Sequence, residues 1–281
     1  METHARADGF GELLRALSAL RAPQWAHFVV LPLAGLSRAA LGSKSGLTRG
    51  ALGLAAASFS LAYAYGLNAV HDRASDASAE KNPLTGDAPL PSFMIAALGA
   101  SAALALGVSV PLGARASLRT LVSLAAGTLY SAPPRLKDRP VLGLVANTAI
   151  FAPLLGLCVI EGEEPPAYEL LAATFVGLLV QNQLLHEIAD ATEDAAGGAF
   201  TTARWLGPER ARFAAAAVAV PFAVIARAVA PTPGLARAAS LVLAAGAAAA
   251  LWRGDPAAAR KRHRGVAAAG GAILYWLGQT T

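Results

Sequence analysis

Two clusters of acidic residues lie 118 residues apart in a chain that otherwise contains few charged side chains. The first cluster contains Asp72 and Asp76, and the second contains Asp190 and Asp194, so the aspartates of each pair are four residues apart. Placing an acidic side chain at the centre of a membrane helix costs roughly 2.5–3.5 kcal/mol, so such a residue usually has a partner or a function. These aspartates are therefore the first candidates for chemistry.

The spacing within each cluster predicts that its polar side chains share one face of a helix, because one turn takes about 3.6 residues. The residues that share a face in this way are Asn68, Asp72 and Asp76 in the first cluster, and Glu187, Asp190 and Asp194 in the second. Carboxylate and amide oxygens suit Mg²⁺, which often bridges protein acids and substrate phosphates. The two faces therefore predict a site for Mg²⁺ and a diphosphate. The alternative is that these acids are ordinary solvated residues of loops.

A basic segment, Tyr130-Ser-Ala-Pro-Pro-Arg-Leu-Lys-Asp-Arg-Pro140, lies between the two acidic clusters. Its three cations, which fall within five residues, are Arg135, Lys137 and Arg139. Cations at this density can neutralise a leaving diphosphate, and arginine can bind phosphate through two hydrogen bonds. Lys81 and Arg21 are weaker candidates of the same kind. The alternative is that the segment only sets the orientation of the chain in a membrane.

The composition predicts a membrane protein. Of the 281 residues, 55% are hydrophobic and 15% are charged, whereas charged residues make up about 25% of soluble domains. The net charge of +5 does not indicate nucleic-acid binding, because the basic residues are dispersed among short loops. The single cysteine, Cys158, excludes an intramolecular disulfide.

The apolar runs predict an all-α polytopic bundle of about nine transmembrane helices, each long enough to cross roughly 30 Å of hydrocarbon. The predicted helices are 24–42, 47–69, 91–112, 117–132, 140–160, 167–188, 208–230, 234–252 and 263–279. With the N-terminus in the cytoplasm, 16 lysines and arginines lie inside and seven outside, as the positive-inside rule requires. Residues 1–23 are then a cytoplasmic segment, and 24–281 form one transmembrane domain. Both acidic clusters and the basic segment face the cytoplasm.

These motifs together resemble those of the UbiA superfamily of intramembrane prenyltransferases. The first cluster is similar to the motif NxxxDxxxD, the basic segment to YSxPPRLKxRP, and the second cluster to DxxDxxxD. The stretch from Asp194 to Gly207 is also similar to the family's sequence after its second motif. Two departures are Glu187, where aspartate is commoner, and His71, where the family often has an acid or an amide.

The resemblance implies Mg²⁺-dependent transfer of a polyisoprenyl group from its diphosphate to an aromatic or lipid-like acceptor within the membrane. The four aspartates would act on the leaving diphosphate, and the ring of Tyr130 could face the allylic cation or anchor the chain at the membrane interface. Whether His71 or His186 accepts a proton stays open. The partners would be a polyprenyl diphosphate, a hydrophobic acceptor and membrane lipid. The arginine-rich and alanine-rich composition suits a bacterial inner membrane.

Two other functions are compatible with the sequence. A transporter with an acidic cation site would also combine many apolar helices with membrane-embedded polar residues. An enzyme like the polyprenyl-phosphate phosphoribosyltransferases of the same superfamily would also use Mg²⁺, and the segment Leu20–Trp25 vaguely resembles those enzymes.

Overall fold

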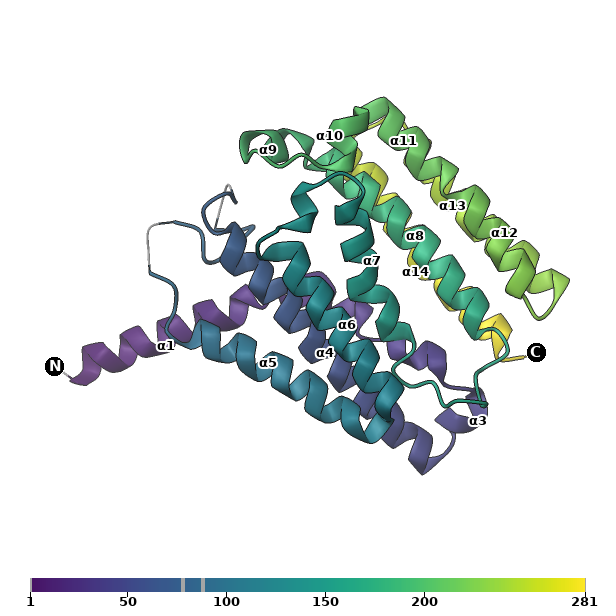
Figure 1. Ribbon diagram of the computed structural model, residues 1–281, viewed down its shortest axis with the longest axis horizontal. Coiled ribbons are helices and arrows are strands. Elements are labelled where there is room, and N and C mark those ends of the chain that lie inside the picture. The colour runs from purple at the N-terminus through teal and green to yellow at the C-terminus, as the bar shows by residue number, and fades with distance from the viewer. Residues whose placement is uncertain (1, 77–78, 87–88, 281) are drawn as a thin grey trace. The chain divides into compact units, whose positions relative to one another are not determined.

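A computed structural model describes residues 2–76, 79–86 and 89–280, and the regular elements in these ranges are α-helices and short 3₁₀-helices (Figure 1). The chain forms two compact units that interleave along the sequence. The N-terminal unit contains Met1–Leu33, Thr48–Leu136 and Ala149–Cys158. The C-terminal unit contains Ala34–Leu47, Lys137–Thr148 and Val159–Thr281. The first acidic cluster therefore belongs to the N-terminal unit and the second to the C-terminal unit.

The N-terminal unit is built around the long helix α4. Its helices are α1 (Glu2–Ala19), α2 (Ala22–Trp25), α4 (Lys44–Asp72), α5 (Phe93–Ser109) and α6 (Ala114–Ser131), together with the end of α7 (Leu142–Leu155). Small residues bring α4 and α6 close together: a Cβ atom added at Gly127 would lie 3.0 Å from the Cβ of Ala64. Close approach through small residues is how membrane helices gain packing contacts without a strong hydrophobic effect. Ala16 and Ala19 of α1 bury their side chains in a cluster that includes Met94 of α5.

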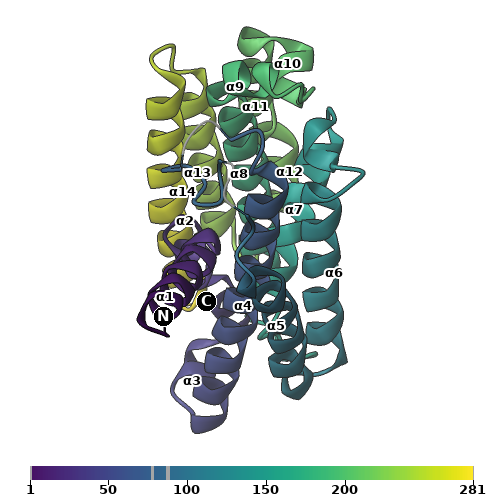
Figure 2. The same ribbon diagram turned by 90° about the vertical axis from the view of Figure 1, so that its left-hand side faces the viewer.

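The C-terminal unit is a bundle in which α8 (Tyr168–Ala189) packs against helices further along the chain (Figures 1 and 2). These are α11 (Pro208–Ala217), α12 (Ala219–Val229), α13 (Pro233–Leu251) and α14 (Pro256–Gly278), and the short α9 (Ala191–Ala196) and α10 (Thr202–Leu206) precede them. A buried hydrogen bond joins α8 to α14, where His263 Nε2 lies 3.0 Å from Gln181 Oε1. Gly246 of α13 leaves room for this pair, because an added Cβ would lie 2.4 Å from Gln181 Oε1.

The structure differs from the predicted helices mainly at 24–42. Instead of one helix, this segment contains α2, two 3₁₀-helices at Ala26–Phe28 and Leu31–Gly35, and α3 (Arg38–Leu41). Pro32 interrupts the segment because proline lacks the N–H group that a helix interior needs. Each of the other eight predicted segments contains helix. Among the residues that the structure describes, four helical stretches are long and apolar enough to cross a membrane: Lys44–Asp72, Phe93–Leu112, Pro208–Val229 and Pro233–Leu251.

Two arginines hold the end of α7 within the N-terminal unit. Arg49 donates from Nε to the carbonyl of Cys158 and from Nη2 to the carbonyl of Leu112, both at 2.8 Å. Arg119 donates to the carbonyl of Gly156. Gly156 and Cys158 lie in the turn that follows α7, and an unpaired backbone carbonyl in an apolar environment is costly, so these arginine side chains satisfy groups that would otherwise lack a partner.

Candidate active site

The first acidic motif lies at the C-terminal end of α4. The helix ends at Asp72, so the prediction that Asn68, Asp72 and Asp76 share one continuous helical face is wrong for Asp76. The chain instead makes a turn after the helix, in which the N–H groups of Ser75 and Asp76 donate to the carbonyl of Asp72 at 3.0 and 2.8 Å. Asp76 is therefore held by this turn and by side chains from outside α4.

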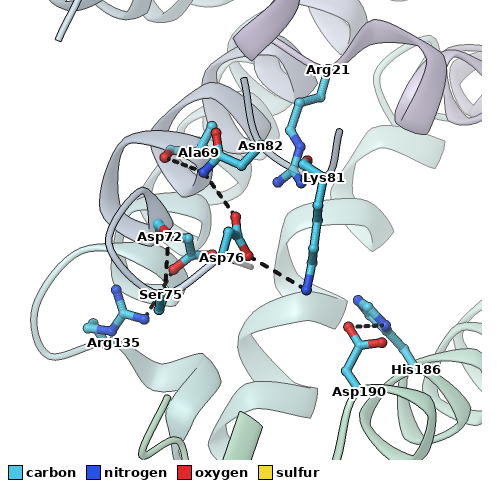
Figure 3. A network of polar contacts seen from close by, with 10 residues as sticks. All are labelled: Arg21, Ala69, Asp72, Ser75, Asp76, Lys81, Asn82, Arg135, His186 and Asp190. Carbon is cyan, nitrogen blue, oxygen red and sulfur yellow. Dashed lines mark hydrogen bonds and ion pairs between the residues drawn. The ribbon is translucent and has the colours of Figure 1, made fainter. Parts of the chain in front are cut away.

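Each aspartate of this motif is paired with a cation from another segment (Figure 3). Arg135 Nη2 lies 3.1 Å from Asp72 Oδ1, and Arg135 Nη1 donates to the carbonyl of His71 at 3.3 Å. Lys81 Nζ lies 3.6 Å from Asp76 Oδ1. The aspartate side chains are only 7% and 9% exposed, whereas those of Arg135 and Lys81 are 30% and 37% exposed. The structure thus brings two predicted phosphate-binding cations to two predicted metal ligands.

Asn82 is a site residue that the sequence analysis missed, although it is next to Lys81. Its side chain is fully buried, and its amide donates to the carbonyl of Ala69 at 2.8 Å and to Asp76 Oδ2 at 2.9 Å (Figure 3). Its Oδ1 accepts a hydrogen bond from the N–H of Leu84 at 3.0 Å. Only a side chain with both donors and an acceptor can make all three bonds. The signal in the sequence was an asparagine before a proline, which is typical of a turn.

Arg21, a predicted phosphate-binding residue, contacts the backbone of the same loop. Its guanidinium donates to the backbone carbonyl of Lys81, and its side chain is buried (Figure 3). Arg21 itself has a φ of 57°, which is uncommon for a residue other than glycine. The predicted phosphate-binding residue therefore lies beside the site and holds the backbone of the loop that carries Lys81.

Polar contacts also join α4 to α6 near the C-terminal ends of both helices. Tyr63 Oη and Thr128 Oγ1 are 2.8 Å apart, and one turn nearer the motif Ser131 Oγ donates to Asn68 Oδ1 at 3.3 Å. The pair of Asp72 and Arg135 continues this series beyond the end of α6. Tyr130 is half-buried near the end of α6, adjacent to Ser131. These contacts fix the register of the two helices and so determine which residues meet at the motif.

The second acidic motif lies at a break between α8 and α9. Asp190 is the residue between the two helices: its N–H donates to the carbonyl of His186 at 3.0 Å in the last turn of α8, and its carbonyl accepts the N–H of Asp194 at 2.9 Å in the first turn of α9. His186 Nδ1 lies 3.3 Å from Asp190 Oδ2 (Figure 3). Glu187 is buried, and its Oε2 accepts the N–H of Ala203 at 3.0 Å. Glu187 thus supports the first turn of α10, in addition to any role toward a metal.

The basic segment continues into the C-terminal unit, where it is attached to the stretch that follows the second motif. The N–H of Phe200 donates to the carbonyl of Asp138 at 3.0 Å, and the N–H of Val141 donates to Thr202 Oγ1 at 2.9 Å. Lys137 and Arg139 lie within this attached segment, and Arg139 is exposed. Arg204, which had no predicted role, closes the intervening loop by donating to the carbonyls of Asp194, at 3.4 Å, and Ala199.

The donor atoms of both motifs suit Mg²⁺, although they do not form a closed cage. Over the described ranges, no group of three or more histidine, cysteine, aspartate or glutamate side chains converges on one point. Mg²⁺ usually keeps several waters and takes one or two protein carboxylates together with substrate phosphates. Asp72 and Asp76, one turn apart and each with a carboxylate oxygen facing a cation, fit that kind of open site.

Comparison with known proteins identifies the family. The model of the UbiA prenyltransferase family matches residues 28–273. The chain is similar to a UbiA homolog from Archaeoglobus fulgidus bound to GPP and Mg²⁺, with 22% identity, a TM-score of 0.72, and coverage of 95% of this chain and 100% of that one. It is also similar to a digeranylgeranylglyceryl phosphate synthase, with 12% identity, a TM-score of 0.70, and coverage of 96% and 99%. No curated protein matches the chain.

The chain belongs to the UbiA prenyltransferase family and is an integral membrane enzyme of that family. The family match confirms the resemblance drawn from the motifs, and the structural matches confirm the all-helical membrane fold. Membership of a prenyltransferase family favours the predicted prenyl transfer over the transporter that the sequence left open.

Proposed function

We propose that this enzyme transfers a prenyl group from a prenyl diphosphate to a hydrophobic acceptor within the membrane, with Mg²⁺ bound at the acidic motifs. The observation that carries the proposal is the arrangement at the end of α4, where two almost buried aspartate side chains meet two more exposed cations. Carboxylates and cations side by side can bind the metal and the phosphates of the same ligand. The A. fulgidus homologs bound to Mg²⁺ with GPP or DMAPP support this class of donor.

The residues that would hold Mg²⁺ are the aspartates of both motifs with their neighbouring polar side chains, namely Asn68, Asp72, Asp76, Glu187, Asp190 and Asp194. Bound Mg²⁺ neutralises the charge that develops on a leaving diphosphate. Asp72 and Asp76 lie on one turn of the chain. This turn is fixed by the hydrogen bond from the Asp76 N–H to the Asp72 carbonyl and by the side chain of Asn82, which binds the Asp76 carboxylate.

The cations would bind the diphosphate oxygens that the metal leaves free. Arg135 and Lys81 already lie at the first motif, and Lys137 and Arg139 follow in the same basic segment. Arginine and lysine preorganised around the leaving group stabilise the transition state because they need not reorganise as charge develops. Apolar helices around the prenyl chain would exclude the water that otherwise captures an allylic cation, and the ring of Tyr130 could stabilise that cation.

The placement in the cell is part of the same proposal. We infer a bacterial inner membrane with the N-terminus and both motifs on the cytoplasmic side, from the excess of lysine and arginine in the corresponding loops. Residues 1–23 would be the cytoplasmic segment, and residues 24–281 would function as one transmembrane domain. A water-soluble diphosphate head would then reach the motifs from the cytoplasm, while its prenyl tail enters the membrane.

The test is release of diphosphate by the purified protein in detergent, supplied with geranyl or geranylgeranyl diphosphate and membrane lipid extract as the source of acceptor. Asp72→Asn and Asp190→Asn should each abolish Mg²⁺-dependent release, because each substitution removes a carboxylate from a metal site. Glu163→Gln, which removes a charge from an exposed loop, is the matched control and should retain wild-type release. Wild-type turnover in both aspartate variants would show that the metal assignment is wrong.

A further inference from the structure

In both ion pairs of the first motif, the carboxylate is more deeply buried than the cation. The carboxylates of Asp72 and Asp76 are almost buried, while about a third of each partner side chain, Arg135 and Lys81, is exposed. Neither cation belongs to α4: Lys81 lies in the loop after it, and Arg135 follows α6. A ligand that approaches from water therefore meets the cations before the carboxylates, and each cation can move without unfolding the helix that carries the aspartates.

These ion pairs are weak enough for a diphosphate to replace the carboxylates as the partner of each cation. Ion pairs that remain partly exposed contribute little net stability, because solvent screens them and holding two long side chains together costs entropy. A diphosphate carries several negative charges and accepts the two parallel hydrogen bonds that a guanidinium donates, so it competes well with a single carboxylate. Asp72 Oδ1 and Asp76 Oδ1, which now face the cations, are also oxygens that a divalent metal would need.

Asp76 can keep its orientation when Lys81 leaves, because its two oxygens have different partners. Lys81 faces Oδ1 at 3.6 Å, whereas Asn82 donates to Oδ2 at 2.9 Å. Asn82 is also bound to the carbonyl of Ala69, and Arg21 holds the backbone carbonyl of Lys81. The backbone of the loop and one carboxylate oxygen are thus anchored, while the Lys81 ammonium is at the end of a flexible chain.

We propose that Arg135 and Lys81 are exchangeable counter-ions, which neutralise Asp72 and Asp76 until a diphosphate binds them and leaves the carboxylates to the metal. This inference rests on the proposed function and adds a mode of regulation to it. Because the cations and the metal compete for the same oxygens, a diphosphate that draws the cations away strengthens metal binding, and by reciprocity the metal strengthens diphosphate binding. The site would then bind free metal weakly and assemble fully only with its donor substrate.

The test is the affinity of the purified protein for Mn²⁺ alone, measured by electron paramagnetic resonance in detergent without substrate. Arg135→Gln and Lys81→Gln should each bind Mn²⁺ about twofold to fivefold more tightly than wild type, which is the upper part of the range expected on removing one partly exposed competing pair. The same variants should bind geranyl diphosphate more weakly in the presence of EDTA. Opposite changes for the two ligands would not arise from general loosening of the fold.

Two further variants make the result decisive. Arg210→Gln removes the same charge from an exposed position to which no role in metal or diphosphate binding is assigned, so its Mn²⁺ affinity should equal that of wild type. Asp72→Asn should bind fewer Mn²⁺ ions per protein than wild type, because it loses the ion of the first motif while the second motif keeps its carboxylates. If Asp72→Asn binds Mn²⁺ as wild type does, the metal site at the first motif is wrong. If Asp72→Asn loses this ion but Arg135→Gln and Lys81→Gln do not gain affinity, or Arg210→Gln gains as much, the exchange alone is overturned.

Discussion

Substitutions of Asn82 should show that its hydrogen bonds, rather than the shape of its side chain, determine its role in the site. Asn82 is fully buried and makes three hydrogen bonds of 2.8–3.0 Å, one of them to the charged carboxylate of Asp76. Asn82→Ala removes all three and leaves the carbonyl of Ala69 and the N–H of Leu84 without this partner. With about 1 kcal/mol for each of the two neutral bonds and about 1.5–3 kcal/mol for the charged one, the local cost is roughly 3.5–5 kcal/mol. The loop that carries Lys81 should then loosen from α4.

Asn82→Asp preserves the shape better but should damage the enzyme more. It keeps the acceptor for Leu84, yet it turns both donors into acceptors and places a second carboxylate where the amide lies 2.9 Å from Asp76. Like charges at this distance repel strongly in a buried site. We therefore expect Asn82→Ala to lower Mg²⁺-dependent diphosphate release and Asn82→Asp to lower it further. If shape alone mattered, aspartate would be the milder substitution, because its side chain has nearly the shape of asparagine.

The assay is diphosphate release together with thermal unfolding in detergent at mildly alkaline pH. Ser92→Ala is the control, because it removes a hydrogen bond in the same unit, at 2.9 Å to Glu12, that is exposed to solvent. It should change both quantities little. Wild-type release by Asn82→Ala, or higher release by Asn82→Asp than by Asn82→Ala, would refute the argument that Asn82 positions Asp76.

Three further predictions concern residues that support the two units. Arg49→Leu should lower the stability of the protein by about 2–4 kcal/mol, seen as a lower unfolding temperature in detergent, because two carbonyls near the end of α7 and the α5–α6 junction lose their donor. Gly246→Ala should also lower the unfolding temperature, because the added Cβ would lie 2.4 Å from Gln181 Oε1, and unchanged unfolding would contradict this packing. Glu187→Gln should unfold within about 1 kcal/mol of wild type, because its amide oxygen can still accept the N–H of Ala203, whereas Glu187→Ala should lose about 1–3 kcal/mol. Equal unfolding temperatures for the two Glu187 variants would argue against this support.

The class of fold and the candidate chemistry could be predicted from the sequence because both depend on local patterns. Repeated long apolar runs with few charges indicate membrane helices, which satisfy their own backbone hydrogen bonds within the bilayer. The aspartates stand out because acids are rare beside such runs. The ends of the helices were predicted less well. Pro32 lies in an apolar run that the structure divides into short helical turns, and α4 ends at Asp72 instead of continuing to Asp76.

The partners of the site residues depended on tertiary structure. The sequence by itself marked Asp72, Asp76, Arg135 and Lys81 by residue type and spacing. It could not show that Arg135 meets Asp72 across 63 residues, because that meeting depends on the register between α4 and α6. Nor could it distinguish Asn82 from any other asparagine in a loop, since its role comes from burial and from three partners, only one of them, Leu84, within two residues of it. Local sequence patterns determined which groups could do chemistry, and packing between distant segments decided which of them face one another, because hydrogen bonds and ion pairs act only over a few ångströms.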